Sequence, residues 1–266
     1  SEKIQSLAEE FCNAKSAVCY SRMGASTQKF GGLCLWLTNV LNIISGNLDK
    51  EGGALFTLPA FDQVGFSGSK GRTGLFGNRK SRVRRLPAYG GEFPVAALAE
   101  EITTEGEGQI KAMVTVAGNP VLSAPNGKAI DQAFEKLDFM VSFDIYLNET
   151  TRHADLIIPP TTGLETPHYD LIFNSLAIRN TSKYSTALFE KSDGQRHDWE
   201  IYKALIQRLT EQPDDGSTPE KTLNFMLKNG PYKNENLSLE KLKSEPNGVD
   251  LGHLKPQLPG RLFTKN

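Results

Sequence analysis

Two polar stretches of this sequence combine side-chain types that can bind a small heterocyclic ligand. The residues concerned are Gly118, Asn119, Pro120 and Ser123 in the first stretch, and Asp144, Tyr146, Asn148 and Thr150 in the second. They offer directional hydrogen bonds and little charge, which suits a heterocycle better than a metal ion. A carboxylate such as Asp144 accepts two parallel hydrogen bonds from a guanine-type edge, while Asn, Thr and backbone groups hold sugar hydroxyls and phosphates. The alternative is that turns simply favour Gly, Asn, Asp and Pro.

Apolar runs place both polar stretches at the ends of predicted strands. The runs cover residues 112–117, 139–143 and 156–158. They stop at Gly118, Asp144 and Pro159, residue types that are rare inside a central strand. Between the first two runs, apolar residues recur every three or four positions, as one buried face of a helix requires. Because parallel strands point their carboxyl ends at one edge of a sheet, Gly118 and Asp144 are expected at the same edge.

The remaining apolar patterns predict further helices and one further strand. Helical spacing extends over residues 4–12, 33–44, 94–102, 199–209 and 219–228, and residues 17–20 read as a strand. Glycines at 46, 52 and 53 can adopt the left-handed turn that ends a helix. The predicted fold class is α/β, with a parallel or mixed sheet, helices on both faces and a Rossmann-like dinucleotide-binding architecture.

Composition and charge exclude several classes of protein. The chain has 266 residues, 38% of them hydrophobic, with a net charge of −1, which argues against a nucleic-acid partner. No apolar run approaches the roughly 20 residues of a membrane span. The three cysteines form no Cys-x-x-Cys pair and cannot supply four thiolates for a cluster, so Cys12 and Cys19 are expected to be buried and reduced. The four scattered histidines predict no metal site.

Residues 62–94 form a basic, glycine-rich connection. Seven cations lie within sixteen residues, at Lys70, Arg72, Arg79, Lys80, Arg82, Arg84 and Arg85. Such a cluster suits a phosphate or nucleic acid, but glycines at 65, 68, 71, 74 and 77 interrupt the segment and the chain as a whole is nearly neutral. We therefore expect a solvated loop, or a surface that faces other domains. A P-loop is excluded because Gly71 follows Lys70 where that motif needs Ser or Thr.

Several strings of the sequence resemble the molybdopterin oxidoreductase family, which contains dimethyl sulfoxide reductase, periplasmic nitrate reductase and formate dehydrogenase. The most specific strings are residues 116–126, 137–150 and 153–159, and weaker ones are residues 22–24, 42–53 and 194–201. The three specific strings occur in the family's order and at its spacing, and the resemblance extends over nearly the whole chain. Two departures concern formate chemistry and the first cofactor loop. Ala54 follows the paired glycines where formate dehydrogenases have Arg-Gly, and Thr27 stands where several relatives have Gln.

The resemblance implies an enzyme with bis(molybdopterin guanine dinucleotide), which carries molybdenum or tungsten. Its implied cofactor-binding residues are Met23, Gly24, Thr27, Gly118, Asn119, Pro120, Ser123, Asp144, Tyr146, Asn148 and Asp198. Asp198 could also cap the helix that follows it. Glu165 and Tyr169 could be structural or could face the ligand. The whole protein would transfer oxygen atoms or electrons, often with a [4Fe-4S] cluster in an N-terminal domain.

We expect this chain to be an internal portion of such an enzyme, without catalytic or metal-ligating residues of its own and without bound cofactor when isolated. The predicted division is a cofactor-binding portion at 1–61, the connection at 62–94, a dinucleotide-binding domain at 95–212 and a helical or irregular linker at 213–266. Expected partners are the remaining domains of the same polypeptide and an electron-transfer partner. We expect a cytoplasmic location, with the periplasm as the alternative. The alternative function is a stand-alone nucleotide-binding module without redox activity.

Overall fold

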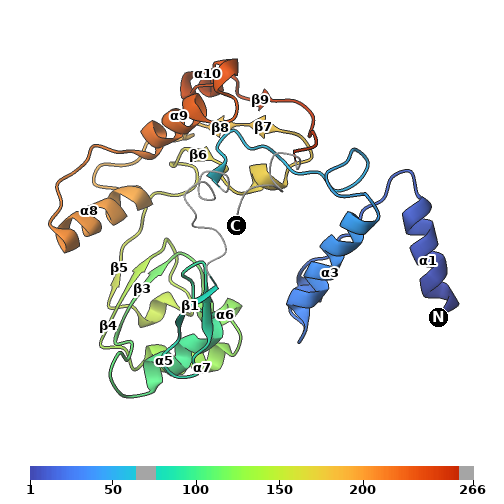
Figure 1. The fold of residues 1–266 in the computed structure, drawn as a ribbon. Helices are drawn as coiled ribbons and strands as arrows, with labels where there is room; N and C mark the ends of the chain where they lie inside the picture. The colour runs from blue at the N-terminus through green and yellow to red at the C-terminus, as the bar shows by residue number, and fades with distance from the viewer. Residues whose placement is uncertain (64–75, 258–266) are drawn as a thin grey trace. The chain divides into compact units, whose positions relative to one another are not determined.

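A computed structural model describes residues 1–63 and 76–257 of the chain (Figure 1). The chain divides into two compact units that are not continuous in sequence. The central unit comprises Gln63–His168 and Ser185–Thr222, and the terminal unit comprises Ser1–Asp62, Tyr169–Tyr184 and Leu223–Asn266. The predicted four-part division followed the order of the chain and stays a prediction.

The central unit contains a three-stranded parallel sheet with strand order β3-β4-β5. The strands are β3 (Ala112–Val116), β4 (Phe139–Phe143) and β5 (Leu156–Ile157). β3 and β4 pair from Ala112↔Phe139 to Val116↔Phe143, so they end level with each other. Two helices, α6 (Pro120–Ser123) and α7 (Gly127–Phe134), connect them. The predicted order of strands and helix in residues 112–160 is confirmed, as is the parallel pairing.

Helices cover both faces of β4. On one face, α7 and α5 (Leu98–Thr103), which continues from the short helix η1 (Val95–Ala97), enclose an apolar core. The buried residues of this core are Ile102, Ile130, Ala133, Phe134 and Met140. Phe143 lies three positions after Met140 and therefore faces the opposite side of the strand. There it packs edge-on against Tyr202 of α8 (Asp198–Thr210), with 5.5 Å between ring centroids. The α/β fold class is thus confirmed.

The described part of the basic connection forms strands, so the expectation of a loop was wrong here, whereas the alternative of a surface that faces other domains stays a prediction. It forms an antiparallel pair, β1 (Phe76–Lys80) and β2 (Pro87–Tyr89). The turn between them is tied to α5, because Arg82 donates to the carbonyl oxygen of Thr104 at 2.6 Å and its Nε lies 3.5 Å from the Glu101 carboxylate. Lys70 and Arg72 lie outside the described residues.

The terminal unit packs its C-terminal helices over a separate apolar core. Its helices are α1 (Glu2–Asn13), α2 (Met23–Ser26), α3 (Gly31–Ile44), α10 (Leu239–Ser244) and, from Leu223 onward, α9 (Pro219–Asn229). Its short elements are the antiparallel pair β7 (Thr181–Ser182) and β9 (Val249–Asp250), with η3 (Phe173–Leu176) and η4 (Lys233–Glu235). Leu227 and Leu242 are completely buried in its core. The chain also contains η2 (Thr151–His153) and the pair β6 (His168–Tyr169) and β8 (Tyr184–Ser185).

Two predictions for the N-terminal part were wrong. Residues 17–20 do not form a strand, because the side chain of Asn42 takes the place of a neighbouring strand. Its amide accepts from the Cys19 N–H and donates to the Cys19 carbonyl, both at 2.8 Å. The predicted burial of the cysteines also failed, since Cys12 is exposed and Cys19 is only partly covered. The cause for Cys12 is that α1 has no buried residue along its length.

None of the helices within the described residues is long and apolar enough to cross a membrane.

Candidate ligand site at the carboxyl edge of the sheet

The chain reverses sharply where β3 ends. The backbone N–H of Ala117 donates to the carbonyl of Phe143 at 2.8 Å, and thereby extends the pairing of β3 and β4 by one hydrogen bond. Ala117 and Gly118 then both adopt left-handed backbone conformations, with φ of +48° and +72°. That conformation is unfavourable for a residue with a Cβ, so Ala117 holds local strain. No other heavy atom lies within 4 Å of where a Cβ on Gly118 would sit, so the glycine is required by its φ and leaves open space above the edge.

Asp144 is the corresponding residue at the end of β4. It is buried, with 7% of its surface exposed. Its Oδ1 accepts from the backbone N–H of Tyr146 at 2.9 Å, and its Oδ2 accepts from Nδ2 of Asn148 at 3.3 Å. A carboxylate can accept about four hydrogen bonds, so capacity remains after these contacts. Asp144 therefore fastens its own loop and can still accept from a ligand.

Asn148 connects Asp144 to two buried threonines. Its Oδ1 accepts from the backbone N–H groups of Thr150 at 2.9 Å and Thr151 at 3.0 Å. The Thr151 hydroxyl closes the turn by donating to the carbonyl of Tyr146 at 2.9 Å. The oxygen of the Asn148 side-chain amide thus accepts and its nitrogen donates. Turning the amide by 180° would therefore lose these hydrogen bonds.

Thr150 joins the loop after β4 to the loop after β3. Its hydroxyl donates to Oδ1 of Asn119 at 2.7 Å and accepts from the backbone N–H of Val121 at 3.2 Å. The hydroxyl of Ser123 meanwhile donates to the Asn119 carbonyl at 2.9 Å. The two polar stretches identified in the sequence thus form one hydrogen-bonded structure along the carboxyl edge of the sheet.

The charges near this edge are paired. Nδ2 of Asn119 donates to Oε2 of Glu149 at 2.5 Å, and this hydrogen bond lowers the pKa of the Glu149 carboxyl. Asp131 of α7 accepts from Arg152 and lies 2.6 Å from Nε2 of His153. The Arg152 hydrogen bond, followed by the His153 contact, lowers the pKa of Asp131. Both carboxylates are therefore ionised at neutral pH.

A sequence model of the molybdopterin oxidoreductase family matches residues 4–208. The chain belongs to the molybdopterin oxidoreductase family. Among its relatives, the Bacillus subtilis protein named "Probable oxidoreductase YyaE" is 28% identical over 191 residues, which are 70% of this chain and 26% of that protein. The Staphylococcus haemolyticus protein named "Putative formate dehydrogenase SH0748" is 27% identical over 219 residues, which are 78% of this chain and 22% of that protein.

A solved structure shows the same fold. Acetylene hydratase from Pelobacter acetylenicus superposes with a TM-score of 0.65 at 16% identity, over 97% of this chain and 37% of that one. The molybdopterin oxidoreductase chain spans about a quarter of the length of the curated relatives named above, at 26% and 22%.

The predicted cofactor residues of this molybdopterin oxidoreductase chain fall in both units. Those gathered at the edge of the central sheet are Gly118, Asn119, Pro120, Ser123, Asp144, Tyr146 and Asn148. Met23, Gly24 and Thr27 belong to the terminal unit. There Met23 is 66% exposed and its carbonyl accepts from the Thr27 hydroxyl at 2.8 Å. Their binding role stays a prediction.

Asp198 is the first residue of α8 and does not cap it, so that part of the prediction was wrong. The N-cap is His197, whose backbone N–H donates to the Glu200 carboxylate at 2.7 Å, the reaching-back contact of a capping box. Asp198 belongs to the helix that packs on β4 through Tyr202. This places it on the element that covers the end of β4, and its predicted contact with the cofactor stays open.

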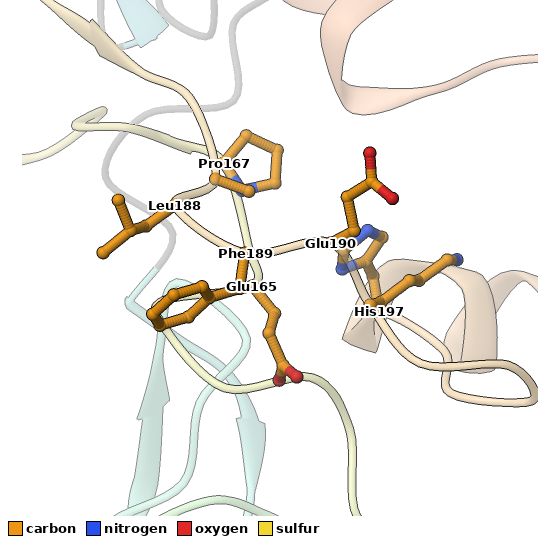
Figure 2. Close-up of a pocket in the computed structure, with 8 residues that line it drawn as sticks. Glu165, Pro167, Leu188, Phe189, Glu190 and His197 are labelled. Atoms are coloured by element: carbon orange, nitrogen blue, oxygen red, sulfur yellow. The ribbon is translucent and has the colours of Figure 1, made fainter.

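A cavity of about 570 Å³ lies elsewhere in the central unit. Figure 2 shows the loop residues Glu165, Leu188 and Phe189 around it, with His197 at the start of α8. The Glu165 carboxylate accepts from the backbone N–H of Thr162 at 2.8 Å, which lowers the pKa of Glu165. Nδ1 of His197 lies 2.7 Å from the Thr161 hydroxyl. These polar groups hold the loop that follows β5, and we assign no ligand to the cavity.

Glu165 and Tyr169 both have structural contacts in the described chain. The hydroxyl oxygen of Tyr169 lies 3.1 Å from that of Ser182, and burial raises the pKa of Tyr169. The sequence did not indicate the parts played by Glu149 and Thr151 at the sheet edge. The usable signal was the spacing of Asn148, Thr150 and Thr151, since an Asn side chain commonly accepts from backbone N–H groups two residues on.

The described residues contain no group of three or more His, Cys, Asp or Glu side chains that could hold a metal ion.

Proposed function

We propose that this chain holds the guanine dinucleotide tail of a molybdopterin cofactor at the carboxyl edge of β3 and β4. The pterin end of that cofactor would carry molybdenum or tungsten for oxygen-atom or electron transfer in the whole protein. The rest of the polypeptide, with a [4Fe-4S] domain and an electron-transfer partner, belongs to the same proposal. A cytoplasmic location of the whole protein is also part of this proposal.

The observation that carries the proposal is the remaining hydrogen-bonding capacity of Asp144. Its buried carboxylate is fixed by Tyr146 and Asn148, and each of its oxygens still has an acceptor position. Guanine presents an N1–H and an exocyclic N2–H side by side, whereas adenine lacks that donor pair. A fixed carboxylate therefore discriminates between the two bases without having to move.

The neighbouring backbone suits the phosphate groups of the same ligand. Within the described residues, no acceptor takes the backbone N–H of Gly118 or Asn119. Both follow the left-handed turn at Ala117, and successive N–H groups in such turns form concave sites for anions. The edge thus offers an acceptor for the base and donors for phosphate, which together fit a guanine nucleotide.

A simple Asp144→Asn substitution would not test this proposal, because the structure gives Asp144 a second task. The new amide would point an N–H group at Nδ2 of Asn148, and Asn148 cannot rotate while its Oδ1 accepts from Thr150 and Thr151. The loop would be disturbed whether or not a ligand binds there. A variant is needed that removes the carboxylate from position 144 and keeps the loop.

The double variant Asp144→Asn with Asn148→Asp meets this need. The amide at position 144 donates to the carboxylate at position 148, which still accepts from the two backbone N–H groups. Calorimetric titration with GDP and ADP should show the unmodified chain binding GDP roughly tenfold more tightly than ADP, for about one net charged hydrogen bond. The double variant should fold normally and lose this preference. Equal affinity for both nucleotides in the unmodified chain, or an undiminished preference in the double variant, would contradict the proposal.

A further inference from the structure

Thr150 is completely buried, so the proton of its hydroxyl needs a hydrogen-bond acceptor. The hydroxyl oxygen already accepts from the backbone N–H of Val121 at 3.2 Å. No solvent reaches the side chain, so the proton requires a protein acceptor, and Oδ1 of Asn119 lies 2.7 Å away. The direction of this hydrogen bond is therefore fixed by burial.

The same contact determines which way the Asn119 amide faces. If the amide were turned by 180°, the Thr150 hydroxyl would meet two donors, Val121 N–H and Asn119 Nδ2, and its own proton would have no acceptor. Thr150 thus keeps the Asn119 oxygen inside and its NH₂ group outside. The NH₂ group has two protons, and one of them points to Oε2 of Glu149 at 2.5 Å.

Asn119 and Glu149 consequently present a donor and a charged acceptor next to each other at the edge of the sheet. Glu149 is exposed and its pKa is lowered, so its carboxylate is a charged acceptor, to which a phosphate oxygen without a proton cannot donate. A sugar hydroxyl has the opposite requirement, because it can donate to a carboxylate and accept from an amide N–H at once. In dinucleotide-binding folds an acidic side chain commonly binds ribose in this way.

We propose that Asn119 and Glu149 bind a ribose hydroxyl of the nucleotide, and that Thr150 is the positioning residue that orients the Asn119 amide for it. The inference rests on the proposed function for the presence of a nucleotide. It adds the chemical group recognised at this point and a residue that acts without touching the ligand.

The test compares GDP with 2′,3′-dideoxyguanosine diphosphate, which lacks both free ribose hydroxyls. Calorimetric titration of the unmodified chain should show GDP binding roughly tenfold more tightly, about the effect of one hydrogen bond to a charged group. Thr150→Val is nearly isosteric but lacks the hydroxyl, and it should remove most of this ratio. Thr150→Ser keeps the hydroxyl and should retain it.

Thr115→Val provides the matched control. Thr115 is also buried, and its hydroxyl bonds to that of Ser142 at 2.7 Å in the same sheet, without contacting Asn119. A general loss of stability should therefore appear in both valine variants. Loss of the preference for GDP over its dideoxy analogue should appear only in the variant at position 150. In an Asn119→Ala background, Thr150→Val should cause no further change in the ratio, because Thr150 acts through Asn119.

The two proposals fail in different ways. Equal binding of GDP and ADP contradicts the assignment of guanine to Asp144. Equal binding of GDP and its dideoxy analogue contradicts the assignment of ribose to Asn119 and Glu149. If the preference for GDP over its dideoxy analogue survives Thr150→Val, or disappears in Thr115→Val as well, Thr150 does not have the positioning role.

Discussion

Arg82 and Arg84 belong to the same basic cluster, but the structure predicts very different consequences when each is replaced by Met. Arg82 is the more enclosed of the two, with 25% of its side chain exposed, and it faces a Glu101 side chain that is 11% exposed. Arg84 contacts Glu100 at 2.6 Å, but its side chain is 51% exposed. The two substitutions remove the same charge from neighbouring positions, so each serves as the control for the other.

The magnitude follows from what each substitution leaves behind. Without Arg82, the carbonyl of Thr104 loses its 2.6 Å donor, and the Glu101 carboxylate keeps only the Val83 N–H at 2.8 Å. Losing hydrogen bonds that involve a charged group costs roughly 1.5–3 kcal/mol, and a partly buried carboxylate without its cation adds to that. We therefore expect Arg82→Met to lower the free energy of unfolding by about 2–3 kcal/mol. Arg84 also donates to the carbonyl oxygen of Ala96 at 2.8 Å, but its side chain is 51% exposed, so water replaces both contacts and Arg84→Met should cost about 1 kcal/mol or less.

The assay must report the central unit, to which both arginines belong. The chain has two tryptophans, Trp36 in the terminal unit and Trp199 in the central unit. In a Trp36→Phe background, urea unfolding followed by tryptophan fluorescence therefore reports the central unit alone. Equal losses for the two arginine variants, or a loss below about 0.5 kcal/mol for Arg82→Met, would refute the conclusion that Arg82 anchors the turn between β1 and β2 on α5.

Two further predictions concern other parts of the chain. Asn42→Ala should destabilise the terminal unit by about 2–3 kcal/mol in urea unfolding, because it leaves both backbone groups of Cys19 without their 2.8 Å partners; an unchanged midpoint would contradict this. Asp131 has a folded-state pKa below its ordinary value of 3.8, mainly through the hydrogen bond from Arg152. Its stabilising contribution is therefore complete above pH 3.8 and lost as the pH falls through the folded pKa. The difference in unfolding midpoint between the unmodified chain and Asp131→Asn should be largest near neutral pH and shrink below pH 3.8; a difference that grows on acidification would contradict this sign.

The strands and helix of residues 112–160 could be predicted because their signals are local. Each apolar run is short and ends at a residue that disfavours a central strand, such as Gly118 or Pro159. The helical connection between the first two strands favours a parallel neighbour with the usual right-handed crossover. The shared edge of Gly118 and Asp144 then follows from topology, without any knowledge of packing.

The wrong predictions share a different cause, which is contact between residues far apart in sequence. Asn42 replaces a strand partner for Cys19 across 23 residues. Arg82 reaches Thr104 across 22 residues, so the basic residues between β1 and β2 form an ordered turn. The helical pattern of residues 4–12 correctly predicts α1 but cannot state what its apolar face packs against, and Ile4 is 69% exposed.

At the sheet edge the sequence supplied the residue types, and only the atomic arrangement shows how binding and turn formation coexist. Taken separately, Asp144, Asn148 and Thr150 are ordinary turn residues, because each has a local hydrogen bond that explains its presence. Those local bonds are what fix the ligand-facing atoms: Asn148 holds the Asp144 carboxylate, and Thr150 sets the direction of the Asn119 amide. A side chain locked by its own loop loses less conformational freedom when a ligand arrives than a free one would. The turn interpretation and the binding interpretation are therefore parts of one explanation, and the variants that separate them must preserve the loop while changing only the atom offered to the nucleotide.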